Sequence, residues 1–388
     1  MKNKQYSIVI VPDRFAHYRY ASFKLISSLR MKSHKITIYA DPREDPSKIP
    51  IVPDTFCNMY FSSGGIFWKK IKSYYIRNVC FWQTELLSLG LSKDVDAVVY
   101  WGEAHRISTW LSAILSRITG KKVVFWTHGI YGRESKVKLI FRLLFYNLAN
   151  SLLLYGRHGK QQLEAAGISK KMYVINNALD VRKQAQYVDS LENSQLHNLR
   201  NIYCTENDRL LVFAGRLERK KRLDLLLAAI SNIKSSGEAI KLIVIGDGGE
   251  RDKLEVLTKA FHLEKDVFFL GPKYNDQVVL QFLRIADLCV SPGEVGLTAM
   301  HALICGTPVI SHSDLTKQMP EVESIRSGIS GFLFERNNVN CLVNKIQVCF
   351  SAIDSGIITF GSCRRVVMKF YTPEYQCKVF YRAIENLL

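Results

Sequence analysis

The chain has 388 residues, of which 47% are hydrophobic, and a formal net charge of +18 at pH 7. Because this length exceeds that of one ordinary domain and the apolar content suffices for a large core, we expect two domains. The nine cysteines are scattered without a Cys-x-x-Cys pair, which excludes a zinc site and a disulfide framework and predicts reduced thiols. The amino end has only four consecutive apolar residues before a charged stretch, unlike a signal peptide, so we expect a cytoplasmic chain.

The positive charge is concentrated in the first half of the chain. Residues 1–200 contain 30 Lys and Arg against 14 Asp and Glu, whereas residues 201–388 contain 23 against 21. This asymmetry predicts an anionic partner, either nucleic acid, a phosphorylated lipid or the inner leaflet of a membrane. A basic surface that is merely solvated is the alternative. The basic half has no recognisable nucleic-acid-binding module, so we expect no nucleic-acid partner.

Short apolar runs that end in turn residues alternate along the chain with stretches of helical periodicity. The runs cover residues 6–12, 35–40, 97–101, 121–129, 151–156 and 172–180 in the first half, and 209–217, 240–249, 267–271, 287–293, 307–311 and 331–335 in the second. This alternation predicts parallel sheets, and two sets of six strands predict an α/β protein of two doubly wound, Rossmann-like domains.

The polar stretch 182–201 lacks strand character and predicts the domain boundary. We expect an N-terminal domain over residues 1–185 and a C-terminal domain over residues 200–369. Ligands of such sheets bind beyond the carboxyl ends of the strands, which in a paired architecture would face each other across a cleft.

Two segments of the first half combine basic with aromatic residues. Residues 67–77 read FWKKIKSYYIR, and residues 135–156 begin as a helix with Lys136, Lys138 and Arg142 among bulky apolar residues. Neither has the roughly 20 apolar residues needed to span a bilayer, so our hypothesis is interfacial helices at an anionic membrane surface. For the second segment, a core helix with a solvated basic edge is the alternative.

The stretch SPGEVGLTAMHALICGTPVI, residues 291–310, joins a strand end to a short helix. We expect this helix to begin near Gly296 and to stop at Gly306, because glycine readily adopts the left-handed conformation after a helix end. Free N–H groups at such a helix start favour a phosphate. Earlier in the chain, Gly215 ends a strand and is followed by Arg216 and Lys221, two cations where a diphosphate would lie; a solvated basic turn is the alternative.

Together these features resemble the retaining glycosyltransferases of family 4, which have the GT-B fold. The family pattern Gly-Arg-Leu-x-x-x-Lys-Gly is matched by GRLERKKR at residues 215–222, with Arg222 in place of the second glycine. VIGDGGERDKLE, FLGP, CGTPVI, MPEVESI and SGISGFLFE resemble the rest of the family's second domain in order, and WTHG and VINNALD resemble two strand ends of its first domain. The last stretch, about residues 370–388, resembles the helix that returns to the first domain in this fold.

The chain departs from the family in the motif of two glutamates separated by seven residues, which contact the donor sugar and the ribose. Alignment on Gly296 and Leu297 places Gly293 and His301 at these positions, so both glutamates are missing. Glu294 is one residue late, although the loop could still turn its carboxylate into the site; a solvated loop acid is the alternative. His301 can form hydrogen bonds to ribose hydroxyls, and a satisfied helix histidine is the alternative.

The resemblance implies sugar transfer from a nucleotide-diphosphate donor with retention of configuration. Arg216 and Lys221 would stabilise the leaving diphosphate, and His128 at a strand end would hold the donor sugar, with capping of the strand as the alternative. With Glu294 they make up the predicted catalytic set. In this family the leaving phosphate is thought to receive the acceptor's proton, so we name no general base. The donor is expected to contact Gly215, Gly246, Asp247, Pro272, Lys273, Gly293, Gly296, Leu297, Thr298 and His301.

Where the family carries a glycine-rich turn, the first helix opens with Arg14, His17 and Arg19. We expect them to bind a phosphorylated acceptor such as a polyprenyl-diphosphate-linked saccharide at the rim of the cleft. The DVD stretch at 94–96 precedes a strand rather than ending one, which favours a polar turn over a metal site, and IGDGGE lacks the spacing of a dinucleotide site. We therefore expect no metal and no redox cofactor.

The sequence thus predicts a cytoplasmic glycosyltransferase, peripheral on the inner face of the cell membrane, that builds a surface polysaccharide or glycolipid. The base of the donor is left open between UDP, GDP and dTDP. A nucleotide-sugar 2-epimerase of the same fold is one alternative and would need acid and base carboxylates. A non-catalytic nucleotide-sugar-binding scaffold is the other, favoured by the two missing glutamates.

Overall fold

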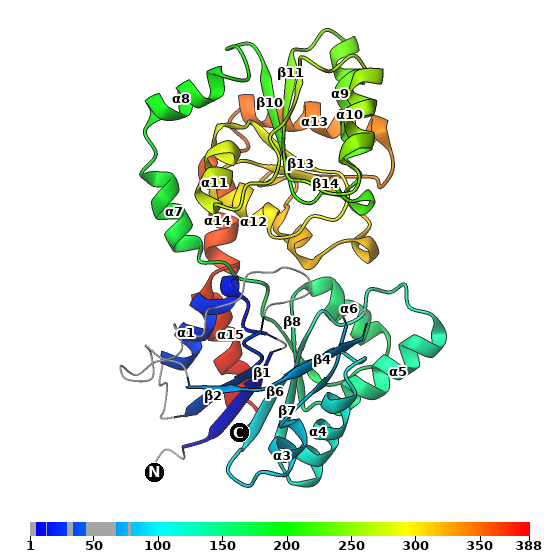
Figure 1. The fold of residues 1–388 in the computed structure, drawn as a ribbon, viewed down its shortest axis with the longest axis vertical. Helices are drawn as coiled ribbons and strands as arrows, with labels where there is room; N and C mark the ends of the chain where they lie inside the picture. Colours follow the sequence, from blue (N-terminus) through cyan, green and yellow to red (C-terminus); the bar gives the residue numbers. More distant parts are fainter. Residues whose placement is uncertain (1–4, 13, 29–33, 44–66, 77–78) are drawn as a thin grey trace. The chain divides into compact units, whose positions relative to one another are not determined.

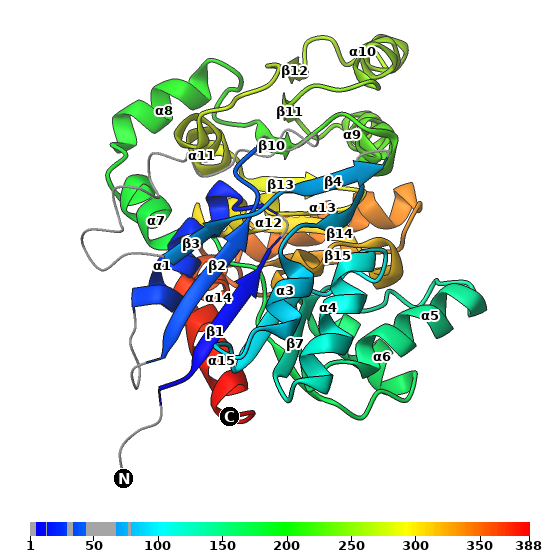
Figure 2. The same ribbon diagram turned by 60° about the horizontal axis from the view of Figure 1, so that its bottom comes forward.

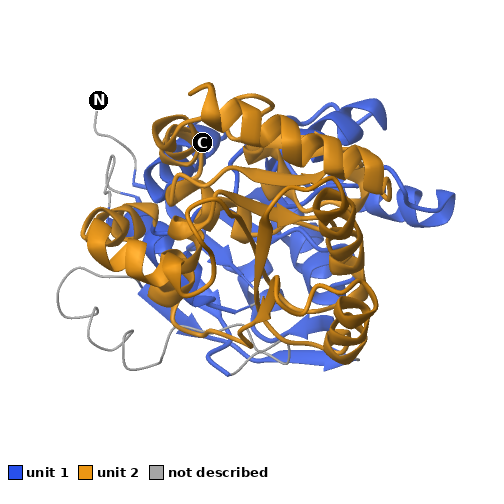
Figure 3. Ribbon diagram, turned by 90° about the horizontal axis from the view of Figure 1, so that it is seen from above, with its two compact units in different colours: residues 1–180, 372–388 blue, residues 181–371 orange. Residues whose placement is uncertain are grey.

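A computed structural model describes residues 5–12, 14–28, 34–43, 67–76 and 79–388. The chain divides into two compact units, one of Met1–Asp180 with Thr372–Leu388 and the other of Val181–Tyr371 (Figure 3). Each unit is built around a parallel sheet with helices on its faces (Figure 1). The predicted α/β class with two parallel sheets is confirmed.

Unit 1 contains a seven-stranded sheet in the order β3-β2-β1-β6-β7-β8-β9, in which every pairing is parallel. In β1, Ile8 and Ile10 enter one hydrophobic core while Val9 and Val11 enter another, so both faces of the sheet are buried. Burial on both faces accounts for the uninterrupted apolar runs in the sequence. The strands are β1 (Ser7–Val11), β2 (Lys35–Ala40), β3 (Phe67–Lys70), β6 (Ala97–Trp101), β7 (Lys122–Thr127), β8 (Ser151–Leu154) and β9 (Lys171–Val174).

Helices cover both faces of this sheet (Figures 1 and 2). One core includes Phe23 of α1 (Tyr20–Ser28) and Phe380 of α15 (Pro373–Glu385), so the carboxyl-terminal helix is part of unit 1. The other core includes Phe125, stacked on Phe145 with ring centroids 4.2 Å apart. Its helices are α3 (Leu86–Leu91), α4 (Ile107–Ile118), α5 (Lys136–Asn147) and α6 (Arg157–Ala165), and a short 3-10 turn, η1 (His17–Arg19), precedes α1.

Residues 67–76, for which we expected an interfacial helix, form strands instead. β3 pairs with β2 at the edge of the sheet, and Trp68 is buried there, with its Nε1 donating to the carbonyl oxygen of Ala40 at 3.0 Å. β4 (Ser73–Ile76) pairs with β5 (Val79–Gln83) in an antiparallel ribbon. The helix prediction was wrong because one buried aromatic residue alternates with exposed Phe67 and Lys69, which is the periodicity of a strand.

Unit 2 contains a six-stranded parallel sheet in the order β12-β11-β10-β13-β14-β15. All six strands predicted in the second half of the chain are present, with the central strand β10 buried from Leu210 to Phe213. The strands are β10 (Arg209–Ala214), β11 (Ile240–Ile245), β12 (Val267–Phe269), β13 (Leu288–Ser291), β14 (Val309–His312) and β15 (Gly331–Phe334).

The helix predicted between residues 296 and 306 is α12, and Gly306 follows it with a φ of 78°, the left-handed conformation that stops a helix. The α-helices of unit 2 are α7 (Val181–Asp189), α8 (Asn193–Asn201), α9 (Leu223–Ser235), α10 (Arg251–Ala260), α11 (Asp276–Ile285), α12 (Thr298–Ile304), α13 (Val339–Asp354) and α14 (Phe360–Phe370). Three 3-10 turns join them: η3 (Arg219–Lys221), η4 (Leu315–Lys317) and η5 (Pro320–Ser324).

The polar stretch 182–201 forms most of α7 and α8 rather than a linker between the units. α7 buries Val181, Ala185 and Val188 and contacts α11 and α12. We expected the second domain to begin near residue 200, whereas the compact unit begins at Val181. These three apolar residues lie on one face of the helix, but the sequence around them is polar, so the sequence analysis did not predict that α7 packs against the rest of unit 2.

Candidate functional site

The loops after β10 and β11 approach each other closely at the carboxyl edge of the unit 2 sheet. A Cβ on Gly246 would collide with the carbonyl oxygen of Gly215, so only glycine permits this approach. The N–H of Gly215 donates to the carbonyl oxygen of Ile245 and the N–H of Leu217 to that of Asp247, both at 2.9 Å. The predicted donor-binding glycines therefore join two neighbouring loops where a ligand of such a sheet binds.

A second close approach joins residues 293–294, after β13, to residues 220–221, after β10. The N–H of Gly293 donates to the carbonyl oxygen of Lys221 at 2.9 Å, and the N–H of Glu294 to that of Lys220 at 3.3 Å. A Cβ on Gly293 would collide with the carbonyl oxygen of Lys220 and lie 2.6 Å from the Cα of Lys221. No side chain fits at position 293 in this backbone, so a glutamate cannot occupy it as it does in the family that the sequence resembles.

Lys221 links the same two loops, whereas the side chain of Arg216 is exposed to solvent. The Nζ of Lys221 donates to the carbonyl oxygen of Glu294 at 2.6 Å, and burial together with the charge of Lys220 lowers its pKa. The side chain of Arg216 is 62% exposed, and the Oε1 of Glu218 lies 3.7 Å from its Nη1. Of the two predicted phosphate ligands, Arg216 is thus exposed, whereas Lys221 is hydrogen-bonded to the loop of residues 293–294.

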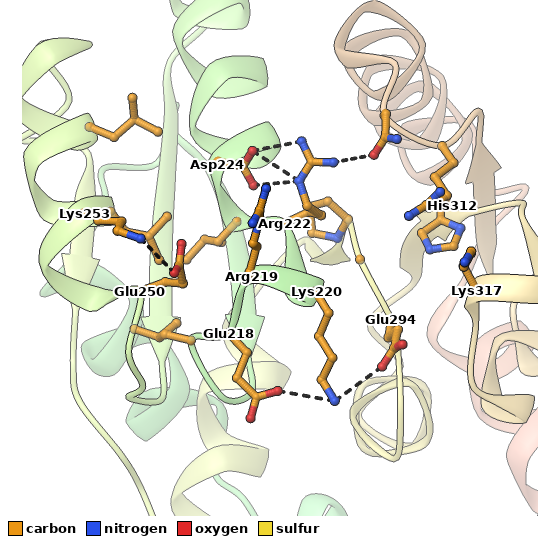
Figure 4. A pocket seen from close by; sticks show the side chains of 18 residues that line it. Glu218, Arg219, Lys220, Arg222, Asp224, Glu250, Lys253, Glu294, His312 and Lys317 are labelled. Carbon is orange, nitrogen blue, oxygen red and sulfur yellow. Dashed lines mark hydrogen bonds and ion pairs between the residues drawn. The ribbon is translucent and has the colours of Figure 1, made fainter.

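The carboxylate of Glu294 points toward Lys220 (Figure 4), with Oε2 3.6 Å from Nζ. The same ammonium lies 3.3 Å from the Oε2 of Glu218. The carboxylate of Glu294 is therefore half-buried and paired with Lys220, and it faces a neighbouring pocket.

Gln318 supports this loop and was missed by the sequence analysis. Its Oε1 accepts from the N–H of Val295 at 2.9 Å, and its Nε2 donates to the carbonyl oxygens of Gly293 at 3.2 Å and His312 at 3.1 Å and to the Oγ of Ser311 at 2.7 Å. Gln318 is 3% exposed. A glutamine in a loop with no distinguishing neighbours gives no signal of such a role in one sequence.

The start of α12 lies at the end of β10, since the Oγ1 of Thr298 donates to the carbonyl oxygen of Ala214 at 3.0 Å. No heavy atom lies within 4 Å of a Cβ built on Gly296, so the space beside this glycine is open. The carbonyl oxygen of Leu297 already accepts from the N–H groups of Met300 and His301. Burial lowers the pKa of His301 against the opposing charge of Asp276, which leaves its ring neutral at pH 7.

The remaining predicted donor residues lie on exposed loops of the same edge. The Oδ1 of Asp247 accepts from the N–H of Gly248 at 2.9 Å and lies 3.9 Å from the guanidinium of Arg251. Pro272 and Lys273 follow β12 and are exposed. The N–H of Gly246 donates to the carbonyl oxygen of Gly271 at 2.9 Å, which links this loop to the one after β11.

His128 belongs to unit 1 and follows β7. Its ring centroid lies 4.6 Å from that of Tyr155, and its buried Nδ1 has no hydrogen-bond partner among the described residues. Burial and the positive charges of Arg19 and Arg142 lower the pKa of His128 to about 4. The imidazole is therefore neutral at pH 7 and has one N–H donor and one acceptor nitrogen.

Two of the three predicted acceptor-binding residues are buried rather than open at a rim. Arg14 is 7% exposed, donates from Nε to the hydroxyl of Tyr75 at 2.8 Å and binds the carbonyl oxygen of Arg43. Arg19 is 8% exposed, with its guanidinium 4.9 Å from the ring centroid of Trp101. Only His17 is exposed. Sequence showed these charges but not the aromatic residues that surround them.

A buried ion pair beside His128 was also missed. The Nη1 of Arg142 lies 3.0 Å from the Oε1 of Glu134, whose side chain is 5% exposed, and the same Nη1 donates to the carbonyl oxygen of Gly129 at 3.2 Å. Three backbone N–H groups also donate to this carboxylate, and its pKa is lowered. Arg142 reads in the sequence as one more basic residue of an amphipathic helix.

A pocket of about 920 Å³ lies alongside the candidate donor residues in unit 2 (Figure 4). We call it the side pocket; it is lined by residues within 217–224, 250–257 and 292–294 together with His312, Lys317, Arg336 and Asn337. It shares Gly293 and Glu294 with the predicted site residues, whereas Arg216, Lys221, Gly246 and Thr298 are not among its lining residues.

In the part of the chain that the structure describes, no group of three or more His, Cys, Asp and Glu residues is arranged to hold a metal ion. Nor do the described helices include one with the length and apolar content that a membrane crossing requires.

Comparison with known proteins gives a family match for the segment in which most of the predicted donor residues lie. Residues 195–351 match the family of glycosyl transferases group 1. The Staphylococcus aureus poly(ribitol-phosphate) alpha-N-acetylglucosaminyltransferase is 24% identical over 234 residues, 55% of this chain and 46% of that protein. The N-acetyl-alpha-D-glucosaminyl L-malate synthase of Bacillus anthracis is 31% identical over 134 residues, 34% of this chain and 33% of that protein. The chain thus matches less than half the length of each of these relatives.

Solved structures extend the likeness to the whole fold. The crystal structure of Anabaena HepE in complex with UDP superimposes with a TM-score of 0.70 and 17% identity, covering 98% of this chain and 100% of that one. The chain therefore has the GT-B fold, as the sequence predicted.

Proposed function

We propose that this protein is a retaining glycosyltransferase of family 4 type that transfers a sugar from a nucleotide-diphosphate donor to a saccharide or lipid-linked acceptor of a surface polysaccharide or glycolipid. The observation that carries the proposal is the set of glycine-joined strand ends beside Arg216, within the segment that matches group 1 glycosyl transferases. UDP in the structure of HepE supports a nucleoside diphosphate as the leaving group.

The leaving diphosphate is stabilised mainly by Arg216. Its side chain is 62% exposed, with Nη1 3.7 Å from the Oε1 of Glu218, so a phosphate at this strand end can reach the guanidinium and accept two charge-assisted hydrogen bonds from it. Lys221 adds a second positive charge near this strand end and keeps residues 293–294 in place through its hydrogen bond to the carbonyl oxygen of Glu294. Fixed charge near the departing oxygen lowers the barrier because it needs no reorganisation during the reaction.

His128 binds the donor sugar as a neutral hydrogen-bonding group. A ring whose pKa is about 4 carries no charge at pH 7, so it does not repel the cationic character that develops at the anomeric carbon. The acceptor's proton passes to the leaving phosphate, and the reaction needs no metal. Chelation with EDTA should therefore leave the transfer rate unchanged.

We further propose that unit 1 binds an anionic membrane surface through α4 and α5. The α4–α5 face consists of eight apolar residues that are between 39% and 80% exposed: Ile107, Leu111, Ile114, Ile118, Val137, Ile140, Phe141 and Leu144. The ring of Trp110 in α4 packs at a tilt against that of Phe141 in α5, with centroids 4.8 Å apart, so the two helices contact each other at this face. Exposed Lys136 and Lys138 adjoin them, and this combination is typical of interfacial helices on the cytoplasmic leaflet.

Thermal unfolding in the presence of UDP, GDP, dTDP, CMP and their sugar conjugates tests the donor site. One nucleotide should raise the apparent Tm of the wild-type protein, and Arg216→Ala should abolish this shift. Lys259→Ala, which removes an exposed cation outside the described donor residues, is the matched control and should keep the shift. Stabilisation by no nucleotide, or an equal shift in Arg216→Ala, would refute the assigned site.

One observation favours a non-catalytic scaffold as the second candidate. Position 293 has no room for the glutamate that contacts the donor sugar in the family, and Glu294 is paired with Lys220. Hydrolysis of the bound nucleotide sugar without acceptor would exclude a scaffold. The same assay, followed by analysis of the released sugar, would reveal a 2-epimerase by inversion at C2.

A further inference from the structure

The side pocket contains more positive charge than its own carboxylates neutralise. Each of its four acidic residues is paired within the pocket: Asp224 with Arg222 at 2.9 Å, Glu250 with Lys253 at 3.2 Å, and Glu218 and Glu294 both with Lys220. Two further cations of the lining, Arg219 and Lys317, have no carboxylate within 4.0 Å among the described residues. The unpaired cations give the pocket an affinity for an anionic group.

The wall that carries Lys317 also contains a buried histidine with an unused polar atom. His312 is 2% exposed, and its Nδ1 has no hydrogen-bond partner among the described residues. Burial and the charge of Arg336, against the opposing charge of Asp314, lower the pKa of His312 to about 4, so the ring is neutral at pH 7. Figure 4 shows His312 and Lys317 on the same wall of the pocket. A buried polar group without a partner is costly, and a ligand that bonds to it relieves that cost.

The rest of the lining fits a saccharide better than a bare ion. The volume of about 920 Å³ is that of a pocket for an organic ligand and is far larger than one phosphate needs. Leu217, Leu223 and Leu257 supply apolar walls on which a sugar ring can pack. Carboxylates and the amide of Asn337 accept or donate hydrogen bonds to hydroxyl groups, whereas a site for an inorganic anion has no use for four carboxylates.

We propose that the side pocket binds a saccharide that carries a phosphate or carboxylate group, with Lys317 and Arg219 binding the anion and His312 donating a hydrogen bond to it. Of the predicted site residues, only Gly293 and Glu294 line the pocket, so we treat it as a binding site distinct from that of the nucleotide. That this saccharide is a segment of the acceptor chain rests on the proposed glycosyltransferase function. The binding itself does not depend on it.

Isothermal titration with glucose 6-phosphate, glucuronate, inorganic phosphate and glucose tests the proposal, with the protein saturated by the nucleotide that raises its Tm. One or both charged sugars should bind at one site, at least tenfold more tightly than glucose and than inorganic phosphate. Lys317→Ala should weaken this binding about tenfold or more, since it removes one charge-assisted hydrogen bond. His312→Gln should weaken it several-fold, and Lys259→Ala should leave it unchanged. Circular dichroism verifies that each variant is folded.

A parallel titration of Arg216→Ala without nucleotide separates this proposal from the proposed function. If no nucleotide binds the wild-type protein, the predicted donor site is wrong, but the charged sugar should still bind Arg216→Ala with the wild-type affinity. Three results would overturn the side pocket: no binding of either charged sugar, binding in Lys317→Ala that equals that of the wild type, or equal affinities for inorganic phosphate and the charged sugar.

Discussion

Gly293→Ala should destabilise unit 2 strongly although it adds a single methyl group. The new Cβ would collide with the carbonyl oxygen of Lys220 and lie 2.6 Å from the Cα of Lys221, whereas ordinary contacts of a Cβ begin at 3.4 Å. Because both neighbours are backbone atoms, no rotation of a side chain can relieve the overlap. Residues 293–294 must therefore separate from residues 220–221.

The magnitude follows from the bonds that this separation breaks. It removes the two backbone hydrogen bonds between the segments, at 2.9 and 3.3 Å, and the 2.6 Å bond from the Nζ of Lys221 to the carbonyl oxygen of Glu294. With about 1 kcal/mol for each neutral bond and about 2 kcal/mol for the charged one, the free energy of unfolding should fall by roughly 4 kcal/mol. Gly296→Ala is the matched control, because open space surrounds that position, and its effect should stay within about 0.5 kcal/mol.

Urea unfolding with two optical probes locates the damage. All five tryptophans, at positions 68, 82, 101, 110 and 126, belong to unit 1, so their fluorescence reports that unit, whereas far-UV circular dichroism reports both. In Gly293→Ala the dichroism transition should move to lower urea while the fluorescence transition moves less. Equal midpoints for the Gly293→Ala and Gly296→Ala variants would refute the close approach and with it the steric reason for the missing glutamate.

Three further predictions concern pH, a buried ion pair and the membrane. The pKa of His312 rises from about 4 in the folded protein to its ordinary 6.5 on unfolding, so the unfolded state binds more protons below pH 6.5. The contribution of His312 to the free energy of unfolding is therefore complete above pH 6.5. It falls by up to roughly 3 kcal/mol as the pH drops toward 4. His312→Gln should therefore flatten the acid limb of the dichroism midpoint, and an unchanged limb would contradict the burial. Arg142→Ala should lower the stability of unit 1 by roughly 3 kcal/mol in the fluorescence transition, because it leaves Glu134 buried without its cation. Lys69→Ala, which breaks an exposed pair with Glu85 in the same unit, should cost less than about 1 kcal/mol. In co-sedimentation with phosphatidylglycerol vesicles, the double variant Val137→Asp/Ile140→Asp should bind about tenfold more weakly or worse than the wild type. Val256→Asp, which changes a similarly exposed apolar residue of unit 2, should bind like the wild type. Equal binding of the two variants would exclude the α4–α5 face as the membrane-binding surface.

The sheets were predictable because their strands leave a strong signal. Each of the twelve predicted runs is a strand, since residues buried on both faces must be apolar without interruption. β3 and β4 were not predicted, because at the edge of the sheet and in a two-stranded ribbon one buried residue such as Trp68 suffices among exposed charges. The lysines beside aromatic residues in this segment were therefore wrongly interpreted as an interfacial helix.

The candidate site was predictable where the backbone alone sets the residue type. Gly246 and Gly293 are required by close contacts between loops, and Gly306 by a left-handed turn. The resemblance to the family pointed to the first two, and the pattern of a helix end pointed to the third. Side chains that act through tertiary contacts left no such signal. Gln318, which follows β14 in the chain, reaches Gly293 after β13 because these two strands are neighbours in the sheet.

The absence of a glutamate at position 293, where the resemblance to family 4 glycosyltransferases would place one, has a physical cause that links the predicted donor residues to the side pocket. The backbone of residues 220–221 occupies the place that a side chain at position 293 would need, so an acidic side chain can only follow one residue later. At position 294 the side chain emerges on the other side of the loop and meets Lys220, at the boundary of the side pocket. The main chain of the same residue is held by Lys221. A saccharide bound in the side pocket as proposed would, by contacting Lys220 or displacing Glu294, act on the loop that contains the predicted donor residues, and its binding would then alter the affinity for the donor.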